Sequence, residues 1–250
     1  MPAAHKPLAN NKPATQLKDR PPKLVHGTSV HTAFQQLREL IVHGKLSPGT
    51  WIVEGDLAKR LHISRTPIRA ALNKLQQEGY VREHRMANKS RMIVAPLTKE
   101  DSAELYSVIG RLEGLAARST AALPKAERMK IVQQLKALNQ RLADIKGDHR
   151  KQGSIFEIDR DFHRLVVSCS GPRLSAWHKA IEPQAERYWR LYASSIISDL
   201  QLSIAEHNEI IRALADGDPD RVEQGLQTNW TNGCKRLARV IDVFGERGSW

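Results

Sequence analysis

The sequence has few cysteines and no long apolar run, and each shortage argues against a class of protein. Only two of the 250 residues are cysteine, Cys169 and Cys234, and neither lies in a CxxC motif. A structural zinc finger and a disulfide-stapled secreted fold are therefore disfavoured. No segment approaches the roughly 18 apolar residues of a membrane-spanning helix, which excludes a membrane-spanning protein. The N-terminal residues lack the apolar core of a secretory signal, so we expect a cytoplasmic protein.

Positive charge is in excess, and the excess is concentrated near the N-terminus. The chain has 39 Lys and Arg against 27 Asp and Glu, a net charge of +12. Residues 1–27 contribute +4, residues 28–97 contribute +6, and residues 98–250 only +2. This distribution favours a polyanion-binding module joined to a nearly neutral domain. Taken alone, it fits the solvation of a small surface equally well.

The first 97 residues divide into a tail and a small domain. Residues 1–27 are polar and proline-rich with no helical period, which predicts a flexible basic tail. Apolar residues at helical spacing predict helices over about 28–43, 54–61 and 65–78, and β-type runs follow at 80–83 and 91–95. Three helices followed by a two-stranded wing form a winged helix-turn-helix, which we assign to residues 28–97.

The remainder, residues 98–250, is predicted to be helical throughout. Helices are expected at about 98–122, 125–146, 154–169, 173–198, 200–215 and 219–243, separated by glycine and proline breaks. Thr98 is the expected N-cap of the first of these helices, with Asp101 in the capping-box position. The predicted fold class is mainly α, with an N-terminal winged helix-turn-helix and a C-terminal all-α helical bundle.

Residues 64–69, Ser-Arg-Thr-Pro-Ile-Arg, open the third predicted helix, the part of a helix-turn-helix that enters the major groove. Arg65 and Arg69 lie one turn apart on one face, where they can reach guanine edges or phosphates. Ser64 and Thr66 offer hydroxyl groups to the DNA backbone. An isolated arginine pair of this kind is more often a solvated face.

The sequence around that pair closely resembles the GntR family of bacterial transcription regulators. The matching segments are LRELI at 37–41, GKLSPG at 44–49, LA at 57–58, ISRTPIRAAL at 63–72 and LQQEGYV at 75–81. The resemblance implies that Arg65, Thr66 and Arg69 contact double-stranded operator DNA. It also implies that the wing, with basic residues Arg85, Lys89 and Arg91, lies against the minor groove or the backbone.

Two features depart from the pattern of that family. Many relatives have arginine in the second helix where this chain has Gly55, and the wing turn between residues 85 and 91 is longer and more basic than usual. These differences imply another operator sequence and a larger share of affinity from phosphate contacts.

The second half resembles the FCD ligand-binding domain of FadR-like GntR regulators. The motifs are LY at 105–106 with LE at 112–113, DRDFH at 159–163, EHNEII at 206–211, and AL at 213–214 before GD at 217–218. The resemblance implies an effector-binding and dimerisation domain over residues 98–250. The expected protein is then a homodimer that reads a palindrome and responds to a small metabolite, usually a carboxylate.

Three residues of this half are candidate metal ligands. Asp159 and His163 are one helical turn apart, a spacing that lets a carboxylate and an imidazole bind one metal ion. His207 lies on the apolar stripe of its helix, so it points inward and needs a partner; most lone inward histidines are simply hydrogen-bonded in a core. In the family the fourth ligand is usually histidine, where this chain has Asn229. The resemblance therefore implies a divalent metal ion, zinc or nickel, with Asn229 as a poor fourth ligand or a group that binds effector directly.

The expected carboxylate-binding arginine of the first bundle helix is replaced here by Ile109. Arg111 falls on the opposite helix face and is no substitute. Arg187 and Arg190 are candidate replacements on a later helix, although a salt-bridge role on the surface suits them equally. The expectation of a carboxylate effector is correspondingly weaker.

The sequence thus supports a ligand-responsive transcription regulator, expected to be a repressor and not an enzyme. The alternative is a metal-dependent enzyme that uses Asp159, His163 and His207 to activate water, which would leave the winged helix unexplained. A nucleic-acid binder that acts through charge alone would not need the polar cluster.

Overall fold

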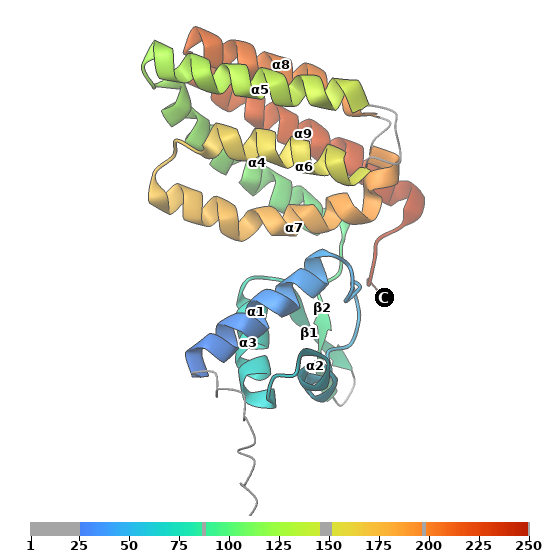
Figure 1. Cartoon of the computed structure of the whole chain (residues 1–250). Helices are drawn as coiled ribbons and strands as arrows, with labels where there is room; N and C mark the ends of the chain where they lie inside the picture. Colours follow the sequence, from blue (N-terminus) through green and yellow to red (C-terminus); the bar gives the residue numbers. More distant parts are fainter. Residues whose placement is uncertain (1–25, 87–88, 146–151, 197–198, 250) are drawn as a thin grey trace, which may run out of the picture.

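The computed structural model describes residues 26–86, 89–145, 152–196 and 199–249. These residues form nine helices and one two-stranded antiparallel sheet, arranged as a small N-terminal domain and a larger helical one (Figure 1). The mainly α fold class is confirmed. Residues 1–25 of the predicted tail lie outside the described residues, and His26 and Gly27 belong to the first helix.

The N-terminal domain is a winged helix-turn-helix. It consists of α1 (His26–Val42), α2 (Glu54–Leu61), α3 (Arg65–Gln77), β1 (Val81–Met86) and β2 (Lys89–Val94). Its core forms where the apolar stripes of the three helices meet, around the fully buried Leu37, Ile68 and Leu75. The predicted helix limits agree with the observed ones to within about two residues.

The wing is longer than the sequence indicated. The strands pair from Val81 opposite Val94 outward to Met86 opposite Lys89, whereas residues 86–90 were expected to be a turn. The prediction was wrong because the outer strand residues are polar and exposed, so no alternation of apolar side chains marks them as strand.

The C-terminal domain is a bundle of α4 (Lys99–Ala121), α5 (Lys125–Ile145), α6 (Gln152–Val167), α7 (Pro172–Ile196), α8 (Leu200–Asp216) and α9 (Pro219–Phe244). In Figure 1, α5 and α8 form one side, α7 forms the side nearest the N-terminal domain, and α4, α6 and α9 lie between them. Among the described residues, no helix combines the length and apolarity needed to cross a membrane.

Two glycines let α4 and α9 approach closely. A Cβ atom at Gly110 would lie 2.9 Å from Cβ of Trp230, and one at Gly114 would lie 3.0 Å from Cγ of Glu223. Any larger residue at Gly110 would push the helices apart. The close approach brings the Trp230 indole to the neighbouring Glu113 on α4.

The junction of the two domains is hydrogen-bonded through α7. Thr98 caps α4 as predicted, since its Oγ1 accepts from the Asp101 backbone N–H at 3.1 Å. Asp101 does not complete a capping box. The Tyr188 hydroxyl takes that place, because it accepts from the Thr98 N–H at 3.1 Å and donates to Asp101 Oδ2 at 2.5 Å.

The last described residues return to the junction. Leu97 and Arg247 form an antiparallel bridge with N···O distances of 2.9 and 3.1 Å. Beyond it, the backbone of Gly248 lies against that of Pro48 and Gly49, where an added Cβ would be only 2.4 Å from the Gly49 nitrogen. The C-terminal segment therefore contacts the linker and the N-terminal domain together.

Candidate functional site: a basic helix face and a cavity in the helical bundle

The start of α3 presents an exposed polar face. Ser64 occupies the N-cap position in extended conformation, as predicted, but its hydroxyl makes no capping hydrogen bond. Arg65, Thr66 and Arg69 are all exposed, while Pro67 and Ile68 between them are buried. The core therefore anchors this turn and leaves its polar side chains on the surface.

Both arginines of this face are placed by α2. Arg69 forms an ion pair with Glu54, Nη2 to Oε2 at 2.7 Å and Nε to Oε1 at 2.9 Å. The hydrogen bond from Arg69 lowers the pKa of Glu54. The Arg65 guanidinium lies beside Gly55, where an added Cβ would come within 3.2 Å of its Nη2.

The basic residues of the wing divide between its two faces. Arg85, Lys89 and Arg91 are all exposed. Because side chains alternate along a strand, the register puts Lys89 and Arg91 on one face and Arg85 on the other. The Arg91 guanidinium lies 5.8 Å from the Trp51 ring, and Arg91 borders a groove that Arg69 lines from the α3 side. The structure thus brings Arg69 and Arg91 to one groove.

A cavity of about 110 Å³ lies inside the C-terminal bundle, lined by residues from α4, α6, α7, α8 and α9. Its aromatic lining comes from Tyr106, Phe156, Trp189 and Trp230, and its polar lining includes Asp159, Arg160, His163 and Asn229. A concave site with apolar walls and a few polar groups is the usual form of a small-molecule site.

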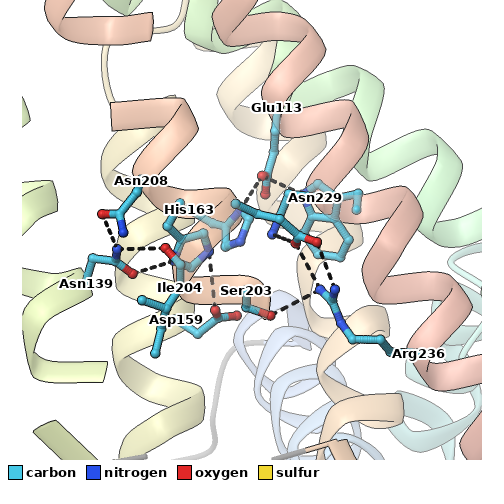
Figure 2. Close-up of polar contacts among 12 residues, drawn as sticks. Glu113, Asn139, Asp159, His163, Ser203, Ile204, Asn208, Asn229 and Arg236 are labelled. Carbon is cyan, nitrogen blue, oxygen red and sulfur yellow. Dashed lines mark hydrogen bonds and ion pairs between the residues drawn. The ribbon is translucent and has the colours of Figure 1, made fainter. Parts of the chain in front are cut away.

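The three predicted metal ligands lie close together, and two of them, Asp159 and His163, line this cavity. One ligand atom each from Asp159, His163 and His207 lie within 4.8 Å of one another. The His207 Nε2 atom is buried with no hydrogen-bond partner and lies 3.6 Å from Asp159 Oδ1 (Figure 2). Ligand atoms about 2.1 Å from a tetrahedral metal ion are about 3.4 Å apart, so this separation fits a shared ion. Two imidazoles and a carboxylate also suit zinc or nickel.

The His207 ring is held in its neutral form. It stacks on Phe162 with ring centroids 3.9 Å apart, and its Nδ1 lies 3.1 Å from Asn139 Oδ1. Asn139 donates from its amide nitrogen to the Ile204 carbonyl, which fixes its oxygen as the acceptor for Nδ1–H. Burial, and then the charge of His163, lower the pKa of His207 well below its usual value. Its Nε2 lone pair is therefore free for a metal ion.

Glu113, which the sequence analysis assigned no role, holds His163 in place. Its buried carboxylate accepts from His163 Nδ1 at 2.6 Å, His178 Nε2 at 2.8 Å and Trp230 Nε1 at 2.7 Å. Burial alone would raise the pKa of Glu113, but His163 and His178 hold it at about 2. Burial would lower the pKa of His163, and Glu113 outweighs this and raises it to about 9. A carboxylate behind a histidine is the usual support for a metal-binding imidazole.

Asn229 lies at the cavity with its amide nitrogen already bound. That nitrogen donates to Glu206 Oε2 at 2.8 Å, which leaves the carbonyl oxygen for a ligand. Glu206 also accepts from Arg236 Nη1 at 2.9 Å. Although adjacent to His207 in sequence, Glu206 thus binds side chains of α9, and Figure 2 shows its partners Asn229 and Arg236.

The candidate arginines of α7 do not line the cavity. Arg190 pairs with Glu186 and lies over the Phe156 ring, and Arg187 is buried and donates to the Ala95 carbonyl in the domain linker. Ile109 is fully buried and Arg111 is exposed, as expected. Among the described residues, the cavity instead receives Arg160 from α6, which sequence reasoning missed.

Family models match both halves of the chain. The model of bacterial regulatory proteins of the gntR family matches residues 30–87, and the FCD domain model matches residues 104–231. The matched ranges contain both exposed arginines of α3 and all three metal-ligand candidates.

The chain is also similar to named regulators and to solved structures. It is 23% identical to Bacillus subtilis (strain 168) YdhC, an uncharacterized HTH-type transcriptional regulator, over 84% of this chain and 91% of that protein. It is 25% identical to the HTH-type transcriptional repressor RspR of Escherichia coli (strain K12), over 77% and 82% of the two chains. E. coli McbR/YncC has the same fold, with a TM-score of 0.62 at 18% identity over 87% of this chain and 99% of that one.

Proposed function

Because this chain belongs to the GntR family of bacterial regulatory proteins with an FCD domain, and is thus a transcription regulator, we propose a specific mode of action. The protein binds a palindromic operator in the cytoplasm as a homodimer and represses transcription. A small effector in the cavity of the bundle controls this binding. One of the similar proteins is named a repressor, which supports the sign of the regulation.

The observation that carries the DNA-binding role is the exposed pair Arg65 and Arg69 at the start of α3. In a helix-turn-helix this turn enters the major groove, where arginine reads guanine through two hydrogen bonds. The basic wing beside it supplies phosphate contacts from Lys89 and Arg91 on one face and Arg85 on the other.

The position of α7 supports control by an effector. Its Glu182, Glu186 and Trp189 line the cavity. Its Gln184 donates to the Glu78 carbonyl at the end of α3, and its Arg187 to the Ala95 carbonyl. A ligand that shifts α7 would therefore move groups that hold the DNA-binding domain.

We further propose that a divalent metal ion, zinc or nickel, binds Asp159, His163 and His207. The unpartnered His207 Nε2 and the support of His163 by Glu113 are the supporting observations. When bound, the ion would offer open coordination positions to a carboxylate or carbonyl group of the effector, with Asn229 as a weak further ligand.

Hydrolytic chemistry at this cluster is less well supported. A metal-dependent hydrolase needs a general base of suitable pKa near the metal. Glu113, with three donors and a pKa of about 2, is too weak a base. Glu182 and Glu186 are paired with Arg164 and Arg190.

The decisive experiment is to sequence the DNA fragments that the purified full-length protein retains from sheared genomic DNA. Enrichment of one palindromic motif, bound by a dimer in sedimentation analysis, would support the proposal. Retention of unrelated fragments in proportion to their length would refute operator recognition.

A further inference from the structure

Arg160 lies at the effector cavity, and no acidic side chain among the described residues pairs with it. It follows Asp159 on α6, lines the cavity, and is half-buried. Its Nε–H is buried and makes no hydrogen bond, and the guanidinium has no ion pair with any described residue. Its guanidinium carbon lies 5.3 Å from the centroid of the Phe156 ring. A buried donor left unpaired is costly, so a polar ligand is expected to take it.

The arginines around Arg160 are already paired. Arg164, one turn further along α6, binds Glu182 at 2.7 Å. Arg190 binds Glu186 at 2.6 Å through Nε, and Arg236 binds Glu206 at 2.9 Å. Of these four arginines, only Arg160 has no acidic partner among the described residues.

The acidic residues that line the cavity also have partners. Glu182 and Glu186 each hold an arginine, Glu113 holds two histidines, and Asp159 belongs to the metal-ligand cluster. The guanidinium of Arg160 is therefore left without an acidic partner among the described lining residues, which fits a ligand that carries negative charge.

Guanidinium groups bind carboxylates through two parallel hydrogen bonds. The remaining lining is largely aromatic, which suits an apolar body. Since a cavity of about 150 Å³ holds benzene, one of 110 Å³ suits a body of about four to six non-hydrogen atoms.

We infer that Arg160 anchors the carboxylate of a small monocarboxylate effector and so determines the charge specificity of the cavity. The inference rests on the proposed function and deepens it. Arg160 would supply from α6 the cation that Ile109 cannot supply from α4.

The test uses butyrate as the probe and butyramide as its uncharged isostere. Indole N–H signals of Trp189 and Trp230 report occupancy by NMR, with the exposed Trp177 as an internal reference; Trp→Phe variants assign the signals. For a ligand of this size we expect a dissociation constant of about 1–10 mM for butyrate. Butyramide should bind at least about tenfold more weakly.

Arg160→Gln should weaken butyrate binding at least about tenfold. The affinity of Arg160→Lys should lie between those of the wild type and Arg160→Gln, because lysine keeps the positive charge but cannot form two parallel hydrogen bonds to a carboxylate. Arg141→Gln, an exposed arginine of α5, is the matched control and should bind like the wild type. Far-ultraviolet circular dichroism and the melting temperature of each variant show that it is folded.

Equal butyrate affinity of the wild type and Arg160→Gln would overturn the inference, as would equal binding of butyramide or no binding up to about 50 mM. Inorganic phosphate that binds as tightly as butyrate would overturn the carboxylate assignment. The proposed function is tested by a separate measurement. Wild-type protein that binds no DNA selectively would contradict the proposed regulator function. The butyrate titration would still decide the role of Arg160.

Discussion

Glu54 on α2 and Arg69 on α3 face each other across the helix-turn-helix in a two-pronged ion pair, with the shortest N–O distance 2.7 Å. The pair orients one of the two arginines at the start of α3 before any DNA is bound. Because the Arg69 side chain remains largely exposed, it can exchange the carboxylate for a guanine or a phosphate.

Replacing either arginine of this face should weaken operator binding. Arg65→Ala and Arg69→Ala should each cost about 1–3 kcal/mol of specific affinity, because each removes a charge-assisted contact. Fluorescence anisotropy with an operator duplex and a scrambled duplex measures the loss. Arg141→Ala, remote from the DNA-binding domain, is the control, and unchanged specific binding in both α3 variants would refute the assignment of the recognition helix.

Removing the carboxylate partner should have the opposite effect. Glu54→Gln deletes a negative charge beside the DNA and frees Arg69, so affinity for specific and scrambled duplexes alike should rise by about threefold at low salt. Glu39→Gln on α1 changes the charge equally at an exposed site that pairs with His43 and not with an arginine of α3. A loss of specific binding in Glu54→Gln would show instead that the pair must hold Arg69 in position.

Replacing Gly55 by alanine should change stability and operator affinity in opposite directions. Gly55→Ala should raise the free energy of unfolding by up to about 1 kcal/mol, since alanine is the better helix former. Its Cβ would displace the Arg65 guanidinium, so operator affinity should fall, by less than in Arg65→Ala. Thermal unfolding and anisotropy on the same samples test both effects; an unchanged affinity would mean that Arg65 does not bind DNA from its present position.

The proposed metal site should bind zinc or nickel with low affinity. Untagged wild-type protein should bind about one equivalent of zinc or nickel with a rise in melting temperature, and His207→Ala should lose it. Asn229→His should bind at least about tenfold more tightly, because imidazole is the better donor. Less than about a tenth of an equivalent in the wild type, with no shift in melting temperature, would favour a metal-free cavity.

Stability of the metal-free protein should depend on pH through His163. The pKa of His163 is raised to about 9 in the folded chain, above its unfolded value of about 6.5, so its stabilisation is complete below pH 6.5 and lost as pH rises through 9. The loss should be on the order of 3 kcal/mol. The melting temperature of protein freed of metal by a chelator should therefore be several degrees lower at pH 9.5 than at pH 6.5.

Two variants check that assignment. Glu113→Gln removes the carboxylate that raises the pKa of His163, so this alkaline loss should disappear, together with part of the stability at neutral pH. His43→Gln, which removes an exposed histidine just after α1, is the control for the loss of a histidine elsewhere. A wild-type melting temperature that is flat between pH 6.5 and 9.5 would contradict a protonated His163.

The sequence predicted the helices well because they follow local spacing. Ser64 and Pro67 mark the start of α3, and Asp159 and His163 share a helix face at a fixed interval. The sequence pattern indicates the role of Glu113 less clearly. It shares the buried face of α4 with Ile109 and Ala116, which indicates an inward carboxylate but not its partners.

Those partners could not be predicted, because they depend on how closely helices pack. Trp230 reaches Glu113 where Gly110 lets α9 approach, and His178 arrives from α7, far along the chain. Arg160 was overlooked for a related reason. Its significance lies in the absence of a partner within the described structure, and only the positions of neighbouring acidic groups reveal that.

The bridge between Leu97 and Arg247 limits how freely the domains can be recombined in chimeric regulators. A fusion cut between residues 97 and 98 divides the chain at the linker, yet the segment that contacts Pro48 and Gly49 comes from the opposite end of the protein. A chimera with a foreign DNA-binding domain would keep a C-terminal segment whose shape fits the original domain and not the new one. Designs that exchange residues 245–249 together with the winged helix should keep this contact matched.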